Sequence, residues 1–505
     1  MPMAASGSQF VTALSLLALG SCAVGPDFVP PDPMLPAVSY SGKPEPAVAV
    51  TPAPAELPGR DYKWWAIFHD PVLTSLEERV ATSNLDIATA TLRLAESRSQ
   101  RGVTASAEFP SINGNASYQR ELFSQNGIVS LFKNLAPGGK PVTIPPISVW
   151  QTGFDASWEI DVWGRVRRQI EAASADVEAS EFQRRDTLVS VLAELARDYI
   201  ELRGIQAQIA ITRANLKSSE EILQLTKIRA EKGTTTGLDV ENAAAQVEAV
   251  RASLPSLKDQ ETEHINALSL LLDEPPGTLR GKLQTAKPIP PAPPRVALGI
   301  PSELARRRPD IRQAEARLHE ATATIGVAVG EFYPKITFNG NVEYNALDLK
   351  NLFRPSSLQY MLGPSVSLPI FAGGRLTSTL DLREAQQIEA AVAYHKTVLQ
   401  AWHEVVNALV AWRTEQERRM HLNAQTKHSR EALALARVRY TNGVADFLTV
   451  LDAERTVLQA DLQYVQSTAD VSANVVRLYK ALGGGWEMKF PEEPEATVAA
   501  LPVPP

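Results

Sequence analysis

Four stretches of the chain alternate between apolar and polar residues, which is the two-residue period of a β-strand. In the clearest of them, Ile336 and Phe338 alternate with Thr337 and Asn339. One face of each strand carries asparagine, serine or acidic groups, which is too polar for a sheet that is buried on both sides. The predicted strands cover about residues 108–120, 150–162, 332–345 and 359–371.

Two of these strands lead directly into very long helices. The period changes at Gly164 and Arg165 and again at Gly374 and Arg375, which we interpret as strand-to-helix junctions. Beyond the junctions, apolar residues follow the i, i+3, i+4 spacing of an amphipathic helix, and no proline interrupts them. At about 1.5 Å per residue, each helix would extend for roughly 100 Å, which is too long for a compact domain. The predicted long helices cover residues 164–232 and 375–442.

Each long helix is expected to reverse at a turn that contains glycine. Gly233 and Gly237 flank the first turn, and Gly443 lies in the second. Return helices are predicted over residues 238–272 and 446–482. The chain is therefore read as two long helical hairpins, each preceded by strands.

The order of strands, long helix and return helix occurs twice in one register, which indicates an internal duplication. Gly153, Gly164 and Gly233 of the first half are matched by Gly363, Gly374 and Gly443 of the second. We expect a signal peptide (1–21), a proline-rich tether (22–60), a first structural repeat (61–287), a proline-rich seam (288–301), a second repeat (302–487) and a disordered tail (488–505).

Composition excludes several classes of function. The formal net charge is only −7, so there is no basic field to suggest nucleic acid as a partner. No run of eighteen apolar residues occurs after the first segment, so any membrane span must be made of strands. His403 lacks the second histidine of a zinc-protease motif, and His421 and His428 share a helix face without a third ligand. We therefore predict no enzymatic activity, no catalytic residue, no cofactor and no metal site.

The single cysteine follows a short apolar stretch. Leu19-Gly20-Ser21-Cys22 resembles a bacterial lipobox, in which Cys22 would carry a diacylglycerol and become the new N-terminus. The first ten residues carry no Lys or Arg, which departs from the usual pattern, and an ordinary buried cysteine is the alternative. If Cys22 is lipidated, the alanine that follows it resembles the sorting pattern of lipoproteins of the outer membrane.

Six motifs together resemble the outer-membrane efflux proteins of the TolC/OprM type, and in particular the NodT-like lipoproteins. They are CAVGPDF, WWxxFxDPxL, RRPDI, EFYPKI, RYTNGVADFLTVLDAER and ALGGGW. The resemblance implies an α+β membrane protein: a homotrimer whose chains each give four strands to a twelve-stranded β-barrel and continue it with a periplasmic α-helical barrel. It also implies two partners, a periplasmic adaptor and an inner-membrane transporter, with solutes leaving through the duct unaltered. Four strands alone cannot close a barrel, since about eight are needed.

The second return helix carries the positions that narrow the periplasmic mouth in this family. Leu448, Asp452 and Arg455 fall at i, i+4 and i+7 on one helix face. Leu448 and Asp452 match the constricting positions, and Arg455 matches a residue that holds the closed state; the resemblance also places Gly233, Gly237 and Gly443 at the tips that face the adaptor. Two alternatives to the efflux channel stay open: a structural periplasmic coiled-coil lipoprotein, and the outer-membrane duct of a protein secretion system.

Overall fold

The computed structural model describes residues 23–33, 63–124, 145–293, 296 and 307–490. These residues form two compact units, each of which takes segments from both sequence repeats. The first unit draws on Met1–Pro30, Ala95–Glu178 and Ala316–Val392, and the second on Pro31–Leu94, Ala179–Glu315 and Ala393–Pro505. The predicted signal peptide with Cys22, most of the proline-rich tether and nearly all of the tail lie outside the described residues.

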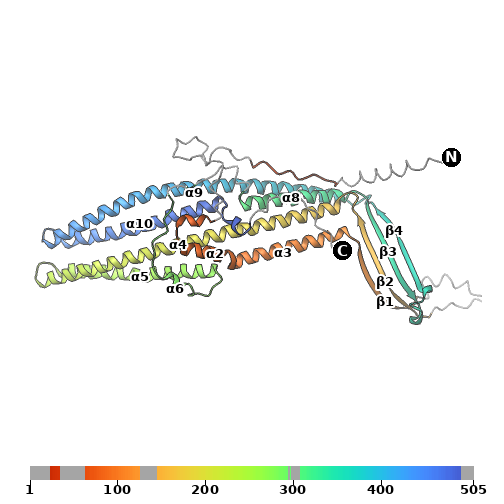
Figure 1. Cartoon of the computed structure of the whole chain (residues 1–505), viewed down its shortest axis with the longest axis horizontal. Coiled ribbons are helices and arrows are strands. Elements are labelled where there is room, and N and C mark those ends of the chain that lie inside the picture. The colour runs from red at the N-terminus through yellow and green to blue at the C-terminus, as the bar shows by residue number, and fades with distance from the viewer. Residues whose placement is uncertain (1–22, 34–62, 125–144, 294–295, 297–306, 491–505) are drawn as a thin grey trace, which may run out of the picture. The chain divides into compact units, whose positions relative to one another are not determined.

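The first unit contains an antiparallel sheet with the strand order β1-β2-β3-β4 (Figure 1). The strands are β1 (Ser111–Glu121), β2 (Ile147–Ile160), β3 (Lys335–Ala346) and β4 (Leu358–Ser367). All four expected strands are present. Strand β4 ends at Ser367, before the predicted boundary, because its partner strand β3 begins at Lys335, the residue that pairs with Ser367.

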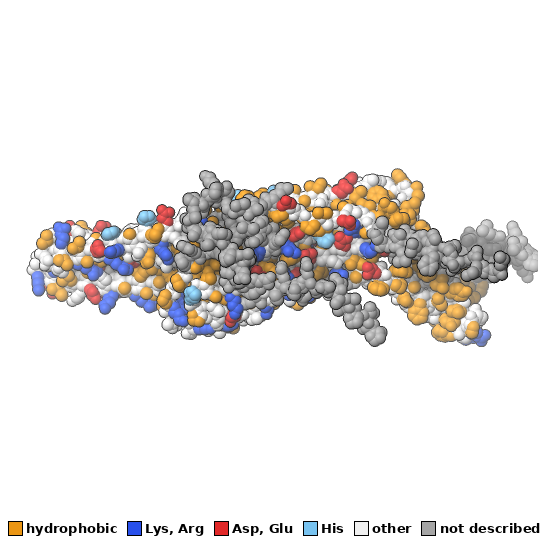
Figure 2. Space-filling model, turned by 45° about the horizontal axis from the view of Figure 1, so that its top comes forward, with side chains coloured by type: hydrophobic (Ala, Val, Ile, Leu, Met, Phe, Trp, Pro, Cys, Tyr) orange, Lys and Arg blue, Asp and Glu red, His pale blue; other side chains and the backbone are white. Residues whose placement is uncertain are grey.

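The strand register gives this sheet one apolar face and one polar face. On one face, Val342 of β3 lies opposite Phe154 of β2 and Tyr360 of β4. On the other, which is mostly polar, the neighbouring Asn341 lies opposite Asp155 of β2 and Met361 of β4. A register slip of one residue would mix the two faces, so the pairing maintains the alternation seen in the sequence. Figure 2 shows apolar side chains gathered over the strands.

Two long helices begin in the first unit and end in the second: α4 (Arg165–Glu231) and α9 (Arg375–Thr441). Their ends fall within a residue of those predicted from the sequence. Two shorter helices accompany them, α3 (Leu85–Ala105) and α8 (Pro309–Gly330). Among the described residues, no helix is long and apolar enough to cross a membrane.

The second unit pairs the far halves of α4 and α9 with their return helices, α5 (Gly237–Leu271) and α10 (Phe447–Ala481). Asp70 is the N-cap of helix α2 (Pro71–Ser83), and its carboxylate accepts hydrogen bonds from the backbone N–H groups of Val72 and Leu73. A large apolar core joins these elements and includes Trp64, Trp65, Leu76, Leu192, Tyr199, Leu268, Val475 and Trp486. The remaining short elements are α6 (Arg280–Leu283), η2 (Trp64–Phe68), η3 (Ser106–Glu108), η5 (Leu349–Asn351), η6 (Pro355–Ser357) and η7 (Trp486–Met488).

Candidate functional site

The first strand-to-helix junction is fixed by charge pairs. Gly164 has φ +80°, a left-handed conformation that favours glycine. The next residue, Arg165, donates two hydrogen bonds to Glu159 at the end of β2, at 3.0 and 2.7 Å. Lys335, at the start of β3, also pairs with Glu159 at 2.9 Å. The bidentate pair therefore ties the end of the strand to the start of α4.

The chain between these residues caps the helix. Asp161 accepts hydrogen bonds from the backbone N–H groups of Val166 (3.0 Å) and Arg167 (2.9 Å), which lie in the first turn of α4. The indole of Trp163 donates to the carbonyl of Pro334 at 2.9 Å, just before β3. Asp161, between β2 and α4, thus helps to hold the direction in which the helix leaves the sheet.

The second junction repeats this backbone with different contacts. Gly374 has φ +82°, and nothing lies within 4 Å of where a Cβ would be. Arg375 pairs with Glu331, beyond the end of α8, at 3.1 Å. The position equivalent to Glu159 is Pro369, so the acid partner comes from another part of the chain. A Cβ on Gly164, by contrast, would lie 2.7 Å from the Cα of Ala23.

Residues 23–29, which we call the N-terminal segment, pack on the first junction. The backbone N–H of Val24 donates to the carbonyl of Trp163 at 3.0 Å. Arg168 of α4, whose side chain is almost fully buried, pairs with Asp27 at 2.6 Å. The ring of Phe28 stacks on His319 of α8, with centroids 4.4 Å apart. The N-terminal segment is therefore docked next to the junction.

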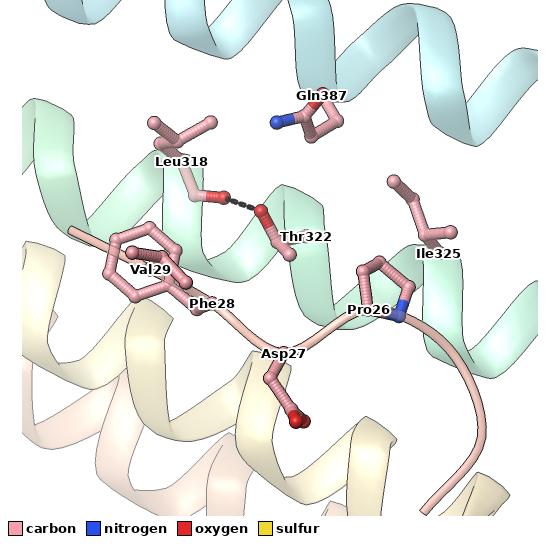
Figure 3. Close-up of a pocket in the computed structure, with 8 residues that line it drawn as sticks. All are labelled: Pro26, Asp27, Phe28, Val29, Leu318, Thr322, Ile325 and Gln387. Atoms are coloured by element: carbon pink, nitrogen blue, oxygen red, sulfur yellow. Dashed lines mark hydrogen bonds between the residues drawn. The ribbon is translucent and has the colours of Figure 1, made fainter. Parts of the chain in front are cut away.

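A small cavity of about 310 Å³ lies between the N-terminal segment and helices α8 and α9 (Figure 3). Pro26 and Phe28 face α8, whereas Asp27 points away from it toward α4. Gly25 and Gly326 meet here, since a Cβ on Gly25 would lie 2.4 Å from the Cα of Gly326. The close glycine contact allows the segment to lie against the helix.

The two helix turns in the second unit share one hydrogen-bond pattern. Gly233 (φ +71°) and Gly443 (φ +74°) both end a long helix in the left-handed conformation. The backbone N–H of Thr234 donates to the carbonyl of Arg229, and that of Val444 to the carbonyl of Arg439, both at 2.9 Å. These are the contacts of a Schellman motif.

Gly237, which flanks the first turn on its other side, does not share this left-handed conformation. It is the first residue of α5, its φ is not positive, and nothing lies within 4 Å of where a Cβ would be. The equivalent position in the second turn is Phe447, which is buried in an apolar cluster with Tyr440 and Val450. Thr236 and Asp239 instead begin α5 as a capping box.

The three predicted gate residues lie on the first turns of α10. Leu448 is 55% exposed, and Asp452 and Arg455 are also exposed. The Nε atom of Arg455 donates to the amide oxygen of Gln246 on α5 at 2.8 Å. Among the described residues, no cation lies within ion-pair distance of the Asp452 carboxylate. We call this exposed set of Leu448, Asp452 and Arg455 the gate face.

A partly buried ion pair beside the gate face was not predicted. Glu454, only 2% exposed, pairs with Arg437 of α9 at 2.8 Å and accepts a hydrogen bond from Ser218 of α4 at 3.0 Å. Arg229 of α4 donates to the carbonyl of Tyr440 and lies over its ring, 4.5 Å from the centroid. These contacts join α4 to α9 and α10, but their partners are far apart in the sequence and form no motif.

Comparisons with known proteins agree with this architecture. A family described as "Outer membrane efflux protein" matches residues 76–274 and 300–484. The chain is 32% identical over 480 residues to the toluene efflux pump outer membrane protein TtgF of Pseudomonas putida, covering 93% of this chain and 95% of that one. It is 30% identical to nodulation protein T of Rhizobium leguminosarum bv. viciae, covering 97% of each. The solved structure of the outer-membrane channel OprN superposes with a TM-score of 0.82 at 32% identity, covering 92% of this chain and all of OprN.

Proposed function

This chain belongs to the outer membrane efflux protein family, and we propose that three copies of it form the exit duct of a tripartite efflux assembly. It is the outer-membrane channel of an efflux system in a Gram-negative bacterium and not an enzyme. The expected α+β fold, with four strands and long helices in each chain, is confirmed. In the proposed assembly, an inner-membrane transporter supplies the energy and a periplasmic adaptor connects it to this duct.

The observation that carries the proposal is the two-faced sheet with open edges. Within the described part of the chain, β1 and β4 each pair with one strand only. In lipid, the unpaired backbone groups of an open edge would cost several kcal/mol each. If β1 of one copy pairs with β4 of the next, three copies close the sheet with twelve strands. The apolar rows would then contact lipid, and the rows with Asn341 and Asp155 would line water.

We propose that Cys22 anchors the chain by its acyl groups. The lipidated residue itself lies outside the described residues, but Ala23 directly follows it and lies against Gly164. The Asp27–Arg168 pair and the Phe28–His319 stack would hold the N-terminal segment at the junction, where a strand that spans the membrane becomes a helix. Acyl chains on Cys22 would thus begin near the inner surface of the outer membrane.

The gate face is proposed to close the periplasmic end. Threefold symmetry would turn Leu448 and Asp452 into rings, and three carboxylates brought close together would attract cations. The hydrogen bond from Arg455 to Gln246 would hold α10 against α5 in the closed state. The turns at Gly233 and Gly443 are proposed to meet the adaptor, which would move these helix pairs apart. The exposure of Leu448 and Asp452 supports this assignment, because a core role would bury them.

Cross-linking tests the proposed assembly directly, since the native chain has only one cysteine. We expect Ser117→Cys in β1 and Ser365→Cys in β4, joined by short bismaleimides, to give covalent dimers and trimers. The control pair is Ser157→Cys and Asn339→Cys, which are register partners in one chain and should link within it. A structural lipoprotein that does not close a sheet would give only monomers with both pairs, and that result would overturn the proposal.

A further inference from the structure

Three side chains of types that can bind a metal meet between α4 and α5 in the second unit. Asp198 and Glu201 lie one turn apart on α4, and His264 faces them from α5. Their ligand atoms all lie within 4.8 Å of one another. The Nε2 atom of His264 is 3.9 Å from a carboxylate oxygen of Glu201, and Asp198 is almost fully buried. Two helices thus bring one imidazole and two carboxylates to one point.

The charges around this cluster are not balanced. Arg197 contacts both acids, at 3.2 Å to Asp198 and 3.8 Å to Glu201, but its side chain is 53% exposed. Glu194 acts on Arg197, and Asp470 of α10 acts on Glu201, so two further negative charges lie near the cluster. Arg418 lies near Asp470, so two arginines oppose these four carboxylates, and the histidine contributes positive charge only when it is protonated. A further cation would be attracted to this position.

We propose that Asp198, Glu201 and His264 bind a divalent transition metal ion, of which zinc is the best fit. Imidazole nitrogen with carboxylate oxygen is a donor set that Zn²⁺ and Co²⁺ accept, whereas calcium and magnesium prefer oxygen alone. A bound ion would lie about 2.0–2.2 Å from each ligand atom. To reach that geometry, the ligand atoms need to move closer to one another by less than about 1.5 Å. Asp198 and Glu201 lie one turn apart on one helix, so both carboxylates can turn toward a common point.

Arg197 and the metal ion would compete for the same two carboxylates. Because the arginine is half exposed, its guanidinium can leave toward solvent when the ion enters. The arginine-bound arrangement joins residues of α4 only, whereas the metal would also bind His264 and join α4 to α5. The metal-bound state would therefore resist separation of this helix pair.

The probe is Co²⁺, added to full-length trimer that was purified without a histidine tag and treated with a chelator. We expect one ion per chain by its visible absorption, and a zinc-dependent rise in unfolding temperature. His264→Gln and Glu201→Gln should weaken binding at least tenfold. His428→Gln is the matched control, because His428 lies by a single carboxylate, Glu431, on an exposed helix face and should leave binding unchanged.

Arg197→Gln separates a built site from a merely structural cluster. If the arginine competes with the ion, its removal should tighten Co²⁺ binding several-fold, even though it removes two ion pairs. Trimer recovery on a native gel confirms that each variant folds. Wild-type protein without bound Co²⁺, binding that survives His264→Gln, or weaker binding in Arg197→Gln would each overturn the proposal.

Discussion

A lysine placed on either face of β3 tests the assignment of lipid and water faces. Val342 and Asn341 are neighbours near the middle of the strand, so they lie at the same depth on opposite faces. Val342 lies between Phe154 and Tyr360 in an apolar row, and Asn341 lies between Asp155 and Met361 on the face that is mostly polar. The two substitutions place the same side chain and charge at adjacent positions of one strand, on opposite faces of the sheet.

The expected difference in stability is large. A lysine on the lipid face near the bilayer midplane costs about 2–4 kcal/mol, so Val342→Lys would cost roughly 6–12 kcal/mol in a trimer. Asn341→Lys should be nearly neutral, because its charge faces water and lies across the strand from the Asp155 carboxylate.

The assay is the fraction of heat-sensitive trimer recovered on gels after folding into lipid vesicles, followed by titration with urea. We expect little Val342→Lys trimer and close to the wild-type amount of Asn341→Lys trimer. Equal recovery of the two variants, or a greater loss with Asn341→Lys, would show that the faces are assigned wrongly.

Three further predictions concern the anchor, the junction and a buried acid. Cys22→Ser, made behind a cleavable signal peptide, should abolish labelling with radioactive palmitate while trimers still form; persistent label would remove the anchor assignment. Gly164→Ala should expose the N-terminal segment to protease, because its Cβ would collide with the segment, whereas Gly374→Ala has the same backbone strain of about 1–2 kcal/mol without the collision and should not. Burial, with the charge of Asp310, raises the pKa of Asp186 from 3.8 to about 6. The folded state therefore favours the protonated carboxyl, and the stability that this gives is complete below pH 4 and is lost as the pH rises through 6. Asp186→Asn should therefore raise the free energy of unfolding at pH 7.5 by up to about 3 kcal/mol, seen as a higher unfolding temperature, and leave both unchanged at pH 4. A similar rise at both pH values would show that the gain does not come from the raised pKa.

The sequence predicted the parts of the fold that local chemistry determines. The ends of α4 and α9 were predicted within a residue. Each helix ends just before a glycine in the left-handed conformation, Gly233 or Gly443, and the sequence shows both glycines. The strand faces followed from a two-residue period that the register preserves. The end of β4 was predicted too late, because the apolar alternation continues through Pro369 although the hydrogen bonds do not.

Contacts between distant segments could not be predicted in the same way. The proline content of the N-terminus indicated a segment without helix, but its docking depends on Arg168 and His319, which lie far along the chain. The partly buried Glu454–Arg437 pair and the cluster of Asp198, Glu201 and His264 have the same origin, since helices that meet in space bring them together. At Gly237 the φ angle is not positive and nothing lies within 4 Å of where a Cβ would be, so another residue would fit there.

The conductance of single channels tests most directly whether the protein is a gated duct. Wild-type protein in a planar bilayer should open rarely and favour cations, and Leu448→Ala combined with Asp452→Ala should raise conductance and weaken cation selectivity with the trimer intact. The matched control is Leu238→Ala with Asn242→Ala, the equivalent positions of the first return helix, which carry no acid and should leave the conductance unchanged. The absence of any channel from intact trimers, or an equal rise in both double variants, would contradict the proposed duct and its gate.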